Sequence, residues 1–221
     1  MESALNRFAL SFQRNWLLVL VAILLLYSGL PILGPVLKSM GFERAAQVFY
    51  QPYKAVCHTY GFRSFYLFGE KIAYSRAEFD QRSGIDTASV QGLFDARDFQ
   101  GNAAMGYKIG ICQRDMAIYP AMALGGIVFS LMRRRMTMMP WWLFLLIGIG
   151  PIGLDGFSQL LSQPPFNNLA LFQLIPYRES VWQLRVITGA LFGFSVAWLI
   201  FPLIAGSLAD PEPQPAGSRR S

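Results

Sequence analysis

The stretch WLLVLVAILLLYSGLPILGPVL, residues 16–37, contains 22 residues and no charge. At a helical rise of about 1.5 Å per residue, it is long enough to cross a hydrocarbon core of about 30 Å. Arg7 and Arg14 precede it as in a signal peptide, but the run is long and no clean cleavage site follows. We therefore expect a retained membrane-spanning helix, kinked or ended early by Pro31 and Pro35.

The whole chain is unusually apolar. Hydrophobic residues make up 53% of its 221 residues and charged residues only 14%, which is too apolar for an ordinary soluble domain. Three later segments are also long and nearly uncharged. We therefore predict an all-α, polytopic membrane protein, a four-transmembrane-helix bundle formed by residues 1–205. The predicted spans are residues 16–37, 116–132, 139–161 and 186–205.

The charges near the segment ends predict the orientation, because Lys and Arg in short loops stay on the cytoplasmic side. Arg133 to Arg135 fill the tight connection between the second and third segments, and Arg7, Arg14, Arg219 and Arg220 agree with it. Both termini are then expected in the cytoplasm and the protein in the plasma membrane. The net charge of +6 fits this anchoring, so we expect lipid as a partner and no nucleic acid.

The same orientation places residues 39–115 and 162–184 outside. Residues 45–74 are rich in Tyr and Phe, which favour the headgroup layer and indicate an interfacial helix. Residues 75–105 alternate charges with Gly and small polar residues, so they are expected to form a solvated loop with one short helix. The Pro-rich tail, residues 206–221, is expected to be disordered and cytoplasmic.

Asp155 lies inside the third predicted span. A carboxylate at that depth costs on the order of 3 kcal/mol unless it faces the helix bundle. Arg185, at the start of the last span, is the expected partner, and the pair would be either functional or a structural ion pair. Gly189 and Gly193 are four residues apart, which is typical of a close helix-packing face.

Four residues could ligate a metal. Cys57 and His58 lie in the aromatic outer segment, and Cys112 and Asp115 precede the second span, where an i, i+3 spacing puts them on one helical face. Thiolate, imidazole and carboxylate are ligands of a divalent metal such as zinc. The chain has only two cysteines and one histidine. Arg114 is expected to point away from them, toward headgroups or the outer loop.

Other interpretations stay open at this stage. Two cysteines on the outer side could form a Cys57–Cys112 disulfide, in a structural or accessory subunit of a membrane complex. They could also cycle as a dithiol in a membrane thiol or quinone redox enzyme. Whether the protein is an enzyme is therefore open. A homo-oligomer or a membrane-complex partner is possible, and Arg63 could contact lipid phosphate or remain solvated.

Four motifs, CHTYGFRSFYLFG, GICQRDMAIYPAMALGG, LDGFSQLL and RESVWQLRVITGALFGF, resemble in order and spacing the domain-of-unknown-function family 2085 of multi-pass prokaryotic membrane proteins. The resemblance runs from about residue 50 to 205. The family's pattern falls here on Cys57, His58, Arg63, Cys112, Arg114, Asp155 and Arg185, and against it residues 75–105 resemble an insertion. The family's Cys-x-Arg-Cys element has Asp115 at its last position here, which implies a more oxygen-rich ligand set. The resemblance implies no activity.

Overall fold

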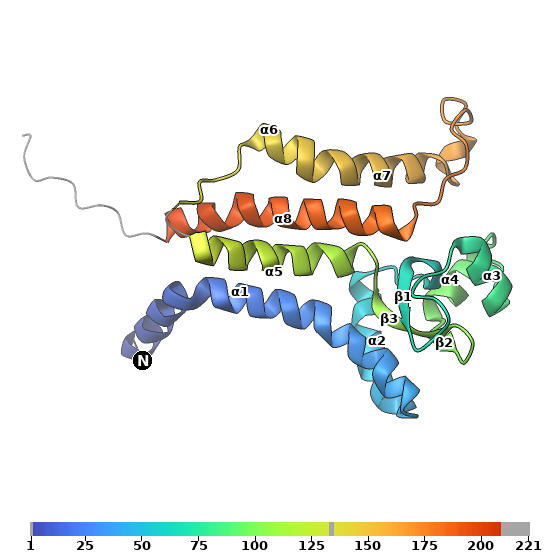
Figure 1. Ribbon diagram of the computed structural model, residues 1–221, viewed down its shortest axis with the longest axis horizontal. Helices are drawn as coiled ribbons and strands as arrows, with labels where there is room; N and C mark the ends of the chain where they lie inside the picture. The colour runs from blue at the N-terminus through green and yellow to red at the C-terminus, as the bar shows by residue number, and fades with distance from the viewer. Residues whose placement is uncertain (1, 133–134, 209–221) are drawn as a thin grey trace, which may run out of the picture.

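The computed structural model describes residues 2–132 and 135–208 and contains four helices long and apolar enough to cross a membrane. These helices run side by side as one bundle (Figure 1). The described part thus confirms the predicted four-helix membrane architecture. Their bounds are Leu10–Ser39, Asp115–Met132, Trp141–Leu161 and Trp182–Ser207. Arg133, Arg134, Arg219 and Arg220, and the predicted tail from residue 209 onward, lie outside the described residues.

The first helix, α1 (Glu2–Ser39), continues through both of its prolines. Of the two alternatives, a kink or an early end, the early end is therefore wrong. Beyond a turn, α2 (Glu43–Val56) folds back, and the ring of Tyr50 lies against Gly34, where an added Cβ would be only 3.0 Å from the ring. The absence of a side chain at Gly34 thus lets α2 pack closely on α1.

Glycines also bring α5 (Asp115–Met132) and α8 (Trp182–Ser207) together. A Cβ on Gly193 would lie 2.1 Å from the backbone oxygen of Ile118, and one on Gly189 would lie 2.8 Å from that of Arg114. Only a residue without a side chain fits at such distances. The predicted packing face at Gly189 and Gly193 is confirmed, and it fixes Arg114 beside the start of α8.

The third crossing changes its helical winding in its first half. It consists of α6 (Trp141–Leu143), the π-helical segment η2 (Phe144–Ile149) and α7 (Gly150–Leu161). Pro151 in the first turn of α7 has no N–H to donate to the preceding turn. This missing donor gives a physical reason for the wider winding just before it. The segment ends in α7, which carries Asp155.

The region outside the bundle contains a small sheet that the all-α prediction missed. It has three antiparallel strands in the order β1-β3-β2. The central strand is almost fully buried along its length, so its sequence lacks the alternation of polar and apolar residues typical of a half-buried strand. The strands are β1 (Ser64–Leu67), β2 (Gly101–Asn102) and β3 (Gly106–Cys112).

The inserted segment is also more ordered than expected. Instead of a solvated loop with one short helix it forms α3 (Arg76–Ser83) and α4 (Val90–Asp98). A capping box between Ser75 and Glu78 starts α3. Short 3₁₀ turns, η1 (Gly61–Arg63) and η3 (Phe166–Asn168), complete the elements of the described chain.

This outer region has its own hydrophobic core, which includes the fully buried Phe79 and Met105. It caps one end of the bundle, opposite the end where the chain begins (Figure 1). The last residues of α2 and β3 lie at the junction between this cap and the spans.

Candidate functional site

The two cysteines stand at the ends of neighbouring elements. Cys57 follows the last residue of α2 in an extended conformation, and its N–H bonds the carbonyl of Tyr53. Cys112 ends β3, where it is paired with Ser64 of β1. The side chain of the next residue, Gln113, is buried and donates to the Ser64 carbonyl over 3.0 Å. Regular hydrogen bonding therefore fixes both thiols.

Cys57, Cys112 and Asp115 form a cluster. One potential ligand atom from each lies within 4.8 Å of those of the other two. Asp115 begins α5, and its backbone N–H donates to Sγ of Cys112 over 3.4 Å. The turn from β3 into α5 therefore brings a thiol and a carboxylate together at a helix N-terminus. The predicted shared helical face is wrong, because Cys112 ends a strand.

The two thiols are free and perturb each other. Hydrogen bonding from Cys112 lowers the pKa of Cys57 despite its burial. The same hydrogen bond, together with burial, raises the pKa of Cys112. Cys57 is therefore the sulfur that ionises first. The Cys112 thiol keeps its proton and donates a hydrogen bond to the sulfur of Cys57.

The structure does not bring His58 into the cluster. Its side chain is exposed, and its ring centroid lies 5.8 Å from that of Tyr60. Because the backbone is extended at Cys57, adjacent side chains point to opposite sides. His58 therefore faces away from the thiols, although it lines the same cavity.

That cavity has a volume of about 270 Å³ and joins the cluster to several basic side chains. Its wall combines the two thiols and the Asp115 carboxylate with three guanidinium groups. The polar and charged residues that line it include Cys57, His58, Arg63, Cys112, Arg114, Asp115, Gln159 and Arg185. Most of the predicted site residues therefore surround one space.

Asp155 is buried as predicted, but its predicted partner is wrong. Its carboxylate pairs with Arg114 and, over 2.9 Å, with Arg178. Ser180 Oγ also donates to it over 2.8 Å. The expectation that Arg114 points toward headgroups or the outer loop is therefore also wrong, because its guanidinium pairs with the buried Asp155 carboxylate on α7.

Arg185 pairs instead with Glu179, six residues earlier in the loop before α8. Arg63 also reaches this carboxylate, through Nε over 3.0 Å and Nη2 over 3.2 Å. Gln159 donates to Glu179 over 3.0 Å. Burial opposes ionisation of Glu179, but Arg63 and Arg185 hold its pKa below the ordinary value.

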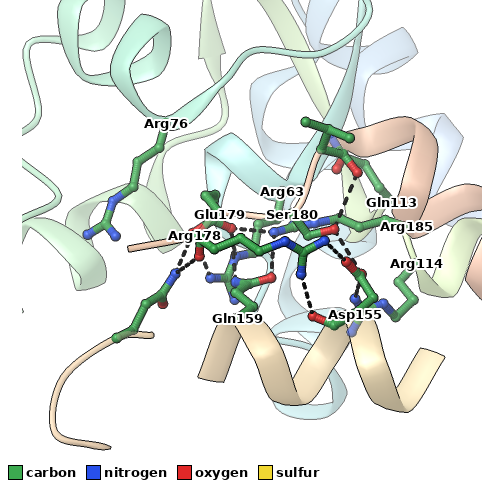
Figure 2. Close-up of polar contacts among 12 residues, drawn as sticks. Arg63, Arg76, Gln113, Arg114, Asp155, Gln159, Arg178, Glu179, Ser180 and Arg185 are labelled. Carbon is green, nitrogen blue, oxygen red and sulfur yellow. Dashed lines mark hydrogen bonds and ion pairs between the residues drawn. The ribbon is translucent and has the colours of Figure 1, made fainter. Parts of the chain in front are cut away.

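Figure 2 shows the resulting arrangement, in which arginines from separate elements converge on two carboxylates. The sequence did not predict a role for Gln159, Arg178, Glu179 or Ser180. A signal was present, because Arg178 and Glu179 are the only charged residues between Asp155 and Arg185. An isolated pair of opposite charges in an apolar stretch indicates an ion-paired role.

Comparison with known proteins agrees with the motifs. Residues 102–199 match the model of the family described as "Predicted membrane protein (DUF2085)". The match includes β3, the second and third spans and most of the last span, with Cys112, Asp155 and Arg185, but it begins after Cys57. No solved structure matches the chain.

The chain is also similar to a curated protein of Methanocaldococcus jannaschii named "Uncharacterized protein MJ1492". The two are 23% identical over 197 residues, which cover 86% of this chain and 93% of that protein. The match of residues 102–199 to the family model confirms the predicted resemblance to this family of predicted membrane proteins.

Proposed function

We propose that the cavity is a metal-binding site at the outer face of the plasma membrane, with Cys57, Cys112 and Asp115 as ligands of a divalent ion such as zinc. The observation that carries the proposal is the convergence of their ligand atoms within 4.8 Å of one another. Two sulfurs and one oxygen form a ligand set that zinc accepts.

The spacing supports a tetrahedral ion. Zinc–sulfur bonds of about 2.3 Å place two tetrahedral ligand atoms about 3.8 Å apart. A small inward movement from the observed limit of 4.8 Å would reach that separation. Three protein ligands would leave a fourth position for water or another small ligand, as in zinc sites that do more than stabilise a fold.

The surroundings suit a ligand site. Ligating groups need partners that hold their orientation. The N–H of Asp115 reaches Sγ of Cys112, and Gln113 ties the end of β3 to β1. His58 is not included among the proposed ligands, since it lies outside the cluster.

The orientation belongs to the same proposal. The cluster lies at the end of the bundle opposite the beginning of α1 (Figure 1). Arg7, Arg14 and Arg135 belong to the other end, where basic residues favour the cytoplasm. The site would therefore face outward in a multi-pass protein whose termini are cytoplasmic. Association with a second copy or with a membrane complex stays a prediction.

Elemental analysis of the detergent-purified full chain tests the proposal. We expect about one equivalent of a divalent metal in the unaltered protein and loss of it in Cys57→Ser and Cys112→Ser. His58→Ala is the matched control, because it alters the same cavity but leaves the cluster intact. Retention of metal by both cysteine variants, or an unaltered protein that takes up none when supplied with zinc, would overturn the proposal.

A second candidate function rests on the proximity of the two sulfurs, which lie within 4.8 Å of each other, and agrees with the lowered pKa of Cys57. Such a pair can act as a dithiol that forms a disulfide while giving up two electrons and two protons. A membrane quinone could accept both and become a quinol. Thiol trapping separates the two candidate functions. For a redox pair, the number of alkylated cysteines should fall when a quinone is added. For a metal site, the bound metal should protect both cysteines from alkylation.

A further inference from the structure

We propose that the cavity beside the thiols also binds a phosphate-type oxyanion, held by the guanidinium groups of Arg114 and Arg185. The proposal deepens the proposed metal site and rests on it in part, because the anion would lie next to the open ligand position. The arginines, however, supply the main attraction, so anion binding and metal binding can be measured separately.

The charge balance around the cavity supports an anion. Four guanidinium groups, those of Arg63, Arg114, Arg178 and Arg185, share only two carboxylates, Asp155 and Glu179. The Asp115 carboxylate at the cavity wall offsets one of the two remaining positive charges, so one positive charge is left in excess. The excess is the same when two neutral thiols are replaced by two thiolates and a divalent ion. An uncompensated charge is costly at a partly buried site, so an anion in the cavity would stabilise it.

Arg185 supplies a second, independent observation. Arg185 is only 4% exposed, and its Nη2 already donates hydrogen bonds to Glu179 and Gln159. Its Nε has no hydrogen-bond partner among the described residues, and the same is true of Nε of Arg114. A buried donor without a partner costs about 1–3 kcal/mol. Both residues line the cavity, so an oxyanion bound there would lie beside these two guanidinium groups.

The donor type indicates the ligand class. Arginine presents several N–H groups in a planar fork that matches phosphate oxygens in pairs. Arg114 and Arg185 are each fixed by a carboxylate on one edge of the fork, which leaves the Nε edge unpaired. The cavity volume of about 270 Å³ has room for a phosphate group. Its position at the junction of the cap and the spans admits either free phosphate or a phosphate-bearing lipid headgroup.

Calorimetric titration of the detergent-purified full chain with inorganic phosphate tests the proposal, in parallel with nanodiscs that contain phosphatidic acid or only phosphatidylcholine. Arg185→Lys keeps the charge but loses the Nε donor. Loss of one charge-assisted hydrogen bond weakens binding about tenfold to a hundredfold. Arg178→Lys is the matched control, because it also keeps the charge, and Arg178 belongs to the same ion-pair network but does not line the cavity.

Saturable phosphate binding that Arg185→Lys weakens and Arg178→Lys preserves would support a free-phosphate ligand. The same pattern seen only with phosphatidic acid would support a lipid headgroup. No binding of either probe, or equal weakening by both variants, would overturn the proposal. Arg114→Lys provides a second test if Arg185→Lys does not fold. Metal content measured on the same samples keeps the two claims distinct, since Arg185→Lys should retain its metal.

Discussion

Arg114, in the turn that joins β3 to α5, pairs with the buried Asp155 of α7. This contact ties the second span to the third on the membrane side of the cap. A Cβ on Gly156, the residue after Asp155, would lie 3.6 Å from Nη1 of Arg114, so the guanidinium passes close along the helix backbone. The ion pair thus links the residues that follow Cys112 to the interior of the bundle.

A double-mutant cycle should find Asp155 coupled to Arg114 rather than to Arg185. Residues in direct ionic contact show interaction energies of about 0.5–3 kcal/mol. We expect such a value for Asp155→Asn with Arg114→Gln, and likewise for Glu179→Gln with Arg185→Gln. The combination of Asp155→Asn with Arg185→Gln should give a smaller value. Unfolding in detergent measures all three, and a larger coupling between Asp155 and Arg185 would contradict the observed pairing.

Gly193→Ala should destabilise the bundle. The new Cβ would lie 2.1 Å from the Ile118 carbonyl oxygen, which forces α8 away from α5. Overpacking of this kind costs about 1–3 kcal/mol. Gly206→Ala, on the same helix with nothing within 4 Å of its Cβ position, is the control and should be neutral or slightly stabilising. Thermal unfolding in detergent compares the two, and equal midpoints would be inconsistent with close packing at Gly193.

Lys108 should make stability rise with pH. It is 1% exposed in β3, and its Nζ donates to the carbonyls of Thr59 and Arg97 over 2.6 Å each. Burial and, secondly, the Lys54 ammonium lower its pKa to about 7. An unfolded chain keeps the ordinary value of about 10.4. Between these values the unfolded chain binds the extra proton, so folding is penalised most below pH 7 and less as pH rises.

The gain should approach about 1.4 kcal/mol per pH unit between pH 7.5 and 9.5. Lys108→Met lacks the titrating group, so its stability should rise less steeply across the same window. Unfolding free energies measured at several pH values give one slope for each protein. Other titrating groups are common to both proteins, so they do not affect the difference between the two slopes. Parallel slopes for the two proteins would show that Lys108 is not perturbed.

In metal-free protein, Cys57 should be alkylated by iodoacetamide at lower pH than Cys112. Hydrogen bonding from Cys112 lowers the pKa of Cys57, whereas burial and that same bond raise the pKa of Cys112. Cys112→Ala removes the donor and should move the alkylation midpoint of Cys57 upward. Mass spectrometry of the labelled protein reports the order of modification. Earlier labelling of Cys112 would reverse the assignment.

Long uncharged runs made the four spans predictable, because bilayer thickness imposes a length that few other structures share. Cys57, Cys112, Asp115 and Asp155 could be selected since each is rare or costly in its context. Which arginine pairs with which carboxylate could not be predicted, because two carboxylates and several arginines lie at similar depth. The choice of Arg114 for Asp155 depends on the turn after β3, whose strand has no alternating pattern. Lys108 was missed for the same reason, since a lysine in such a strand suggests a solvated position.

X-ray absorption at the zinc edge on the zinc-loaded full chain tests the central claim most directly, because it counts sulfur neighbours. We predict two sulfur atoms at about 2.3 Å, with the remaining ligands oxygen. Cys112→Ser should retain one sulfur, and His58→Ala should leave the spectrum unchanged. A spectrum with no sulfur neighbours in the unaltered protein would contradict the proposed site.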